Sequence, residues 1–97
     1  MASALVVANV RFKDKERYLR YATAFPAVFA RSGGQVLAAD ESPLPFDGEG
    51  AGVDKIVVLR FDSEAAARTF LNSPEYVRIC EDRDAGASLD SWIVRAF

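Results

Sequence analysis

Leu59-Arg60-Phe61-Asp62-Ser63, in the second half of the chain, repeats the arrangement of Val10-Arg11-Phe12-Lys13-Asp14 in the first half. In both stretches a strand pattern ends at Arg-Phe, and a side chain that can cap a helix follows two residues later. Two strand–helix units in tandem, each followed by a further strand, are typical of a split βαβ fold of the ferredoxin-like type. Only Arg and Phe are identical in the repeat, which therefore indicates a shared architecture and no recent duplication.

The order βαββααβ follows from the hydrophobic spacing around this repeat, and residues 1–97 form one predicted domain. Asp14, Ser63 and Ser73 are the expected helix N-caps, and Pro74 fits the first position of the last helix. The helices are predicted to run from these caps to about residues 31, 72 and 84. The predicted strands span residues 4–12, 35–41, 54–61 and 89–97.

The fold class is then α+β, with a four-stranded, antiparallel-type sheet of mixed strand order. We expect the first and third strands to be its central, parallel neighbours. Side-chain alternation turns one apolar set toward the helices: Val6, Ala8, Val10, Phe12, Val57, Leu59 and Phe61. The opposite set faces no helix: Val7, Asn9, Arg11, Ile56, Val58 and Arg60. A half-apolar face left open on so small a domain predicts a homodimer through the open sheet face.

Composition excludes several classes of partner. A net charge of −2 gives no general attraction to nucleic acid or to an anionic membrane surface. No apolar run approaches the ~20 residues of a membrane span, and the start lacks the basic region of a secretory signal. RNA-recognition domains share this strand order, but they stack bases on aromatic side chains of the third strand, and residues 55–60 contain none. We expect a cytoplasmic protein with no nucleic-acid or membrane partner.

The absence of histidine excludes much catalytic chemistry. Ser-His and Cys-His nucleophilic pairs and His-ligated haem or zinc all require it. The single cysteine, Cys80, is expected to be a small buried side chain and not a reactive thiol. The acidic segment 40–54, which includes Glu49, lacks the ligand spacing of a calcium loop and is predicted to be a solvated loop. No metal or cofactor is predicted, and the catalytic residues, if any, are unknown.

Three polar side chains on the predicted open face are candidates for ligand binding. Asn9 would bind a carbonyl or an oxyanion, or its amide would be satisfied by the neighbouring strand or by a dimer mate. Arg11 and Arg60 are expected near one end of the central strands. There they would clamp a carboxylate-bearing ligand, or pair with Asp40, Glu41 or carboxylates of a dimer mate.

Four aromatic side chains are candidates for a pocket between sheet and helices: Tyr18, Tyr21, Tyr76 and Trp92. In the functional interpretation their polar atoms orient a small organic molecule inside an apolar wall. In the alternative interpretation the rings fill the core and the hydroxyls reach the surface. The sequence leaves both interpretations open.

Several local patterns follow one another along nearly the whole chain: Val7-Ala8-Asn9-Val10-Arg11, Asp14 with Tyr18 and Tyr21, Gly33-Gly34, Phe61-Asp62-Ser63 with Ala66 and Ala67, Asn72-Ser73-Pro74-Glu75-Tyr76, and Arg83. In order and spacing they resemble the domain-of-unknown-function 1330 family (DUF1330) of small bacterial proteins. The resemblance implies the dimeric α/β-barrel superfamily, in which two ferredoxin-like protomers pack sheet to sheet. The chain departs from the family after the second strand, where residues 41–48 replace a Glu-Gly-Asp-Trp-like segment.

The resemblance leaves two functions open. The wider superfamily includes cofactor-free oxygenases, lactone isomerases and haem-degrading enzymes, and the lack of histidine argues against the last group. One hypothesis is a dimer that binds a small organic metabolite without a metal or haem. The other is a cofactor-free oxygenase or isomerase of a small aromatic or carbonyl compound, in which Asn9 and an arginine stabilise an enolate while a carboxylate or tyrosine moves the proton. The pocket would be bounded by Asn9, Arg11, Tyr18, Tyr21, Tyr76, Arg83 and Trp92.

Overall fold

The computed structural model describes residues 2–48, 50 and 52–97, so Glu49 of the acidic segment lies outside the described residues. The predicted order βαββααβ is confirmed. The elements are β1 (Ala4–Phe12), α1 (Lys15–Phe29), β2 (Gln35–Asp40), β3 (Lys55–Phe61), α2 (Glu64–Leu71), α3 (Pro74–Gly86) and β4 (Ala87–Arg95). The last strand begins earlier than predicted because α3 runs directly into it without a loop.

All three helices begin at the predicted caps. Each cap side chain accepts a hydrogen bond from a backbone N–H of the first turn, which has no partner inside the helix. The pairs are Asp14 with Arg17 at 3.3 Å, Ser63 with Ala66 at 3.0 Å, and Ser73 with Tyr76 at 3.4 Å. The caps therefore set where each helix leaves the sheet.

The sheet has the strand order β2-β3-β1-β4, and every neighbouring pair is antiparallel. The central position predicted for β1 and β3 is confirmed, but the predicted parallel direction is wrong: Val7 pairs with Val58 in an antiparallel register. The physical reason is the connection. The crossover through α1 makes β2 run parallel to β1 and leaves room for one strand between them. β3 runs antiparallel to both and occupies that position.

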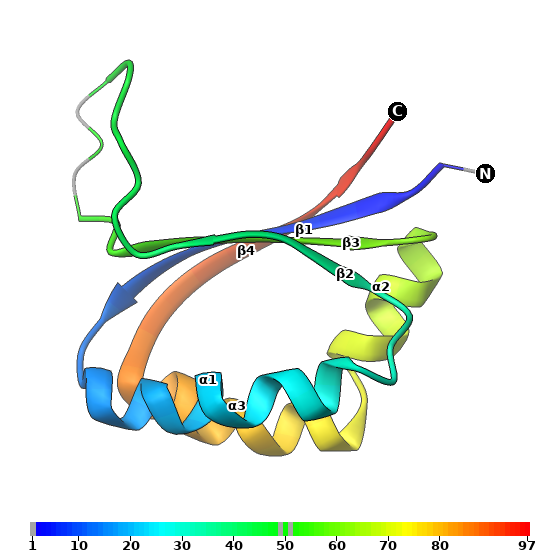
Figure 1. Ribbon diagram of the computed structural model, residues 1–97, viewed down its shortest axis with the longest axis horizontal. Coiled ribbons are helices and arrows are strands. Elements are labelled where there is room, and N and C mark those ends of the chain that lie inside the picture. The colour runs from blue at the N-terminus through cyan, green and yellow to red at the C-terminus, as the bar shows by residue number, and fades with distance from the viewer. Residues whose placement is uncertain (1, 49, 51) are drawn as a thin grey trace.

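Helices cover one face of the sheet only (Figure 1). α1 and α3 pack along each other below the sheet, α2 lies under one end, and the loop of residues 41–48, which follows β2, rises on the other side. The face predicted to meet the helices does so, with Val6, Val10, Leu59 and Phe61 all buried in the core. Within the described residues no helix has the length and apolar character needed to cross a membrane.

Aromatic rings fill much of the layer between sheet and helices. Phe29 lies against Phe61 and Phe70 with ring centroids 5.8 and 5.3 Å apart, and Phe70 lies 4.7 Å from Tyr76. These large rings separate the α1–α3 pair from the strands at one end of the layer. Small side chains on the strands, Ala8 among them, leave space beyond the rings.

Candidate functional site

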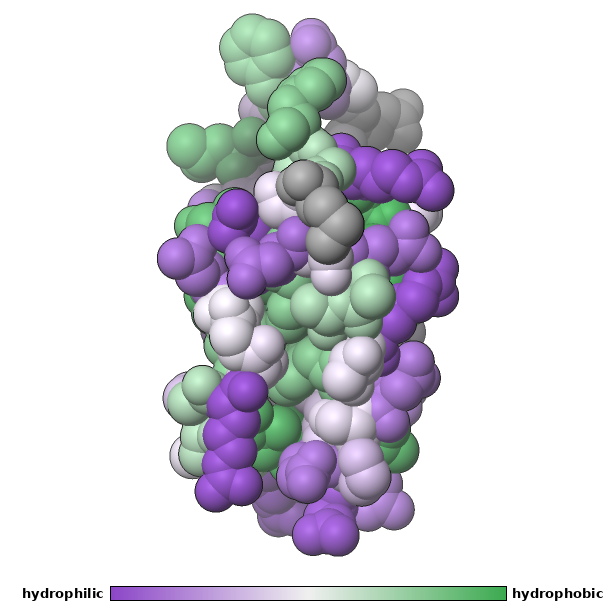
Figure 2. Space-filling model, turned by 90° about the vertical axis from the view of Figure 1, so that its right-hand side faces the viewer, coloured by the Kyte–Doolittle hydropathy of each residue, from purple (hydrophilic) through white to green (hydrophobic). Residues whose placement is uncertain are grey.

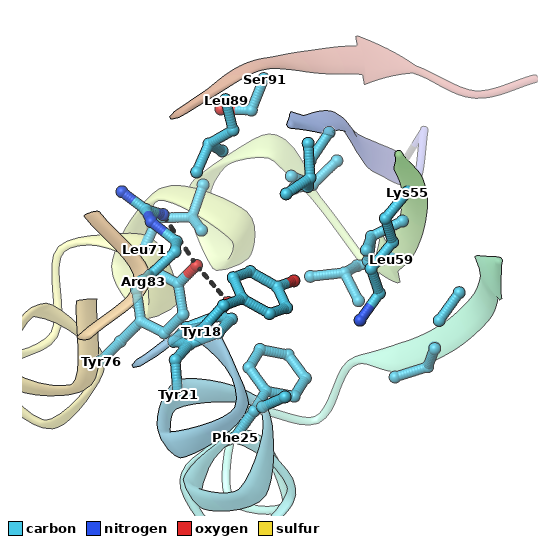
Figure 3. Close-up of a pocket in the computed structure, with 17 residues that line it drawn as sticks. Tyr18, Tyr21, Phe25, Lys55, Leu59, Leu71, Tyr76, Arg83, Leu89 and Ser91 are labelled. Atoms are coloured by element: carbon cyan, nitrogen blue, oxygen red, sulfur yellow. Dashed lines mark hydrogen bonds between the residues drawn. The ribbon is translucent and has the colours of Figure 1, made fainter. Parts of the chain in front are cut away.

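A cavity of about 260 Å³ lies between the sheet and the α1–α3 pair (Figure 3). All four strands and all three helices contribute to its lining, which is mainly aliphatic and aromatic. Its polar side chains are Tyr18, Tyr21, Lys55, Tyr76, Arg83 and Ser91. An apolar wall with a few convergent polar groups is the usual composition of a small-molecule site.

Helical periodicity brings the α1 side chains to this cavity. Tyr18, Tyr21, Ala22 and Phe25 lie three, four and seven positions apart, so they share the face of α1 that is turned toward the sheet. Both pairs of neighbouring rings are in contact, with ring centroids 5.4 Å apart for Tyr18 and Tyr21 and 5.8 Å apart for Tyr21 and Phe25. Both tyrosines, which are candidates for a pocket between sheet and helices, are buried and line this cavity.

Three of the polar groups form a hydrogen-bonded chain at the helix side of the cavity. Nη1 of Arg83 donates to the hydroxyl of Tyr76 at 3.2 Å, and that hydroxyl shares a hydrogen bond of 3.0 Å with the hydroxyl of Tyr21. Burial raises the pKa of both phenols, so they stay protonated near neutral pH. This hydrogen-bonded chain links α1 to α3 and has the character of a structural network.

Tyr18 differs from the other two tyrosines. Its residue is 2% exposed, but its hydroxyl points into the cavity and shares no hydrogen bond with the residues drawn there (Figure 3). Burial, and next the nearby Tyr76, raise the pKa of Tyr18 to about 12. The phenol is therefore a neutral hydrogen-bond donor that is available to a molecule in the cavity.

Lys55 approaches the cavity from the start of β3, and we did not predict it. Its Nζ lies 5.0 Å from the ring centroid of Tyr18. Burial lowers the pKa of Lys55, and the carboxylate of Glu41 opposes that shift. The signal was present in the sequence, because Lys55 shares the strand parity of Val57 and Leu59, which face the helices.

The other four predicted site residues lie away from the cavity. Asn9 pairs with Ile56 on one side and Asp90 on the other, in the register of the open face. Trp92 pairs with the open-face residue Val7 and is 51% exposed. The structure thus brings together four of the eight candidates, namely Tyr18, Tyr21, Tyr76 and Arg83. A single pocket bounded by residues of both sets is excluded because the sheet separates them.

The two open-face arginines lie far apart. Arg60 is level with Leu5 in the antiparallel register, and Arg11 is six residues further along the same strand. At ~3.3 Å per residue this is roughly 20 Å, so of the two alternatives the joint clamp on one carboxylate does not fit the antiparallel register. Both arginines form ion pairs at 3.7 Å, but with Asp90 and Asp62 and not with Asp40 or Glu41.

A metal centre has no support in the described part of the chain, where no three His, Cys, Asp or Glu side chains come close enough to hold an ion. Cys80 is buried, as predicted.

Comparison with known proteins places the chain in a family and a fold. The family model described as domain of unknown function (DUF1330) matches residues 3–97. None of the curated proteins compared with the chain matches it.

Three solved structures show the same fold. A protein of unknown function from Rhodopseudomonas palustris is 23% identical, with a TM-score of 0.78 over 98% of this chain and 81% of that one. SnoaB, a cofactor-independent oxygenase from Streptomyces nogalater, is 12% identical, with a TM-score of 0.72 over 100% and 95%. A dimeric ferredoxin-like protein of unknown function from Thermobifida fusca is 14% identical, with a TM-score of 0.69 over 98% and 92%. These likenesses confirm the ferredoxin-like fold.

Proposed function

The chain belongs to the DUF1330 family, whose function is unknown, and from its own cavity we propose that it binds a small, mostly apolar organic molecule between the sheet and the α1–α3 pair, without a metal or haem. The observation that carries this proposal is the hydroxyl of Tyr18: the residue is only 2% exposed, yet its hydroxyl points into the cavity and shares no hydrogen bond with the other residues drawn there. A hydroxyl that is accessible from inside an apolar cavity can donate to a ligand acceptor or to an ordered water.

The size of the cavity supports the same proposal. Its volume of about 260 Å³ lies just below the ~300–1,000 Å³ typical of small-molecule sites. A ligand of one or two fused rings would fit, with its flat faces against aromatic and aliphatic side chains and an oxygen atom toward Tyr18.

The catalytic alternative is less well supported. An oxygenase or isomerase of the cofactor-free kind needs a group that takes a proton from its substrate. No carboxylate is among the described residues that line the cavity, and the high pKa of the Tyr18 phenol, about 12, makes it a donor at neutral pH. Among the described lining residues, proton transfer would then depend on Lys55. The likeness to SnoaB is one of fold and adds no substrate or catalytic residue.

The first test compares two hydroxyl deletions, with the neutral two-ring amide 2-naphthamide as the probe. Tyr18→Phe should weaken binding of the probe about 5- to 10-fold and leave stability unchanged, because its hydroxyl has no hydrogen bond with the other cavity-lining residues. Tyr76→Phe should lower the free energy of unfolding by about 1–3 kcal/mol, because it removes the hydroxyl that is hydrogen-bonded to both Arg83 and Tyr21. Calorimetric titration and thermal denaturation measure the two effects. A Tyr18→Phe variant that binds the probe like the wild type would contradict the site.

The open sheet face supports a homodimer. Trp92 and Val94 are about half exposed there, at 51% and 43%, and they extend the surface of Val7 and Val58. Leu44 and Phe46 stand 91% and 95% exposed on the loop that rises from the same side. Figure 2, which faces the end of the molecule opposite to this loop, shows apolar side chains at the top, on the side of the sheet away from the helices. Contiguous exposed apolar surface on a small protein marks an association site.

The dimer is tested by charge substitution. The 10.6 kDa chain should elute with twice that mass in size-exclusion chromatography with light scattering. Trp92→Glu should give the monomer mass, because a carboxylate would be buried without a partner. Val77→Glu is the matched control, since Val77 is 54% exposed on α3, away from the sheet, and should remain dimeric. A monomeric wild type would overturn this proposal.

A further inference from the structure

The charged side chains that line the cavity are all basic. Among the described lining residues they are Lys55, from β3, and Arg83, from α3, and no acid accompanies them. The two cations enter from opposite layers, on either side of the three tyrosines (Figure 3). The charges on the cavity lining are therefore all positive, which favours an electron-rich or anionic ligand.

Arg83 is already engaged by protein groups. Its Nε lies 2.9 Å from a carboxylate oxygen of Asp84, and its Nη1 donates to Tyr76. The Arg83 side chain is 23% exposed, and its guanidinium group lies 5.9 Å from the ring centroid of Tyr76. Arg83 is thus part of the hydrogen-bonded chain, and the carboxylate of Asp84 balances its charge.

Lys55 has no such partner within the described residues, apart from the ring of Tyr18. The carboxylate of Glu41 acts on Lys55 through its charge, but it accepts a hydrogen bond of 2.8 Å from Nζ of Lys15. Lys55 is partly buried, so desolvation of its ammonium group costs free energy that no hydrogen-bonded carboxylate offsets. A ligand carboxylate in the cavity would supply the missing partner.

The hydroxyl of Tyr18 points toward the side of the cavity where Lys55 enters (Figure 3). We propose that the ligand is a small organic anion, an aromatic body with a single carboxylate, and that Lys55 and the hydroxyl of Tyr18 bind this carboxylate together. The inference rests on the proposed function and names the class of its ligand. A single charge is expected because Arg83 is neutralised by Asp84, and an apolar body because the rest of the lining is mainly aliphatic and aromatic.

A matched pair of probes tests the charge: 2-naphthoate carries the carboxylate, and 2-naphthamide has the same shape without it. In calorimetric titration of the wild type at neutral pH, 2-naphthoate should bind about 10-fold tighter than the amide. Lys55→Met keeps a long side chain and should bind both probes equally. Lys13→Met, at an exposed position outside the cavity, changes the net charge by the same amount and should keep the preference.

Two further results complete the test. Lys55→Met should melt at or above the wild-type temperature, since it removes a partly buried charge. Glu41→Gln should raise the affinity for 2-naphthoate about 3-fold and leave the amide unchanged, because it removes a negative charge near Lys55. Equal binding of the two probes by the wild type, or a preference that survives in Lys55→Met, overturns this inference alone. Binding of neither probe at millimolar concentration overturns the proposed function as well.

Discussion

Gly86→Ala is expected to lower the free energy of unfolding by about 3 kcal/mol, or Tm by roughly 15 °C. Gly86 is the last residue of α3, and its carbonyl oxygen accepts hydrogen bonds from the backbone N–H groups of Lys13 and Asp14 at 2.8 and 2.9 Å. A methyl group at this position would meet the backbone nitrogen of Tyr18 and lie 2.6 Å from the carbonyl oxygen of Asp14. Backbone atoms cannot rotate away, so α1 and α3 would have to separate.

Gly33→Ala is the control for this prediction. Gly33 has a φ of 76° but nothing within 4 Å of the added methyl group. Gly33→Ala should lower the free energy of unfolding by only about 1–2 kcal/mol, because only the strain of the left-handed backbone conformation is added. Thermal and urea denaturation of both variants measure the difference. A Gly86→Ala variant that melts within a few degrees of the wild type would show that the two helices are not held as closely as described.

Ala8→Leu is expected to weaken binding of either naphthyl probe about 10- to 100-fold while the fold is kept. Ala8 lies on β1 in the face that lines the cavity, between the buried residues Val6 and Val10. A leucine there would extend into the open volume that the ligand needs. Leucine also suits a strand at least as well as alanine, and cavity-filling substitutions are often stabilising.

Ala65→Leu is the matched control, because it adds the same atoms at an exposed position of α2. It should bind both probes like the wild type. Calorimetric titration of the two variants beside the wild type gives the comparison. Unchanged affinity in Ala8→Leu would mean that the probes bind elsewhere.

Local chemistry made much of the fold predictable. Asp14, Ser63 and Ser73 are recognisable as N-caps because a short polar side chain directly before a helical pattern can accept a hydrogen bond from an unpaired N–H of the first turn. The buried faces of β1 and β3 followed from strict alternation. Strand direction was not predictable in the same way, since no residue within a strand encodes it. It depends on the crossover through α1 and on the return through the loop after β2.

The error in direction explains the wrong placement of the two arginines. With β1 and β3 taken as parallel, Arg11 and Arg60 were placed at one end of the sheet, whereas the antiparallel register separates them. Tyr18 and Tyr21 were found because helical spacing reports their face directly. Lys55 was missed because a lysine at the start of a strand was not expected on a buried face, although its parity places it there.

The central claim, that this protein binds a small molecule between its sheet and the α1–α3 pair, is tested most directly by a heteronuclear NMR titration with 2-naphthoate. The backbone amides that shift should be those of residues around the cavity, such as Ala8, Tyr18 and Leu89, together with the side-chain signals of Lys55. The open face, represented by Trp92, should be unaffected. Shifts concentrated on the open face, with the cavity residues unchanged, would contradict the account.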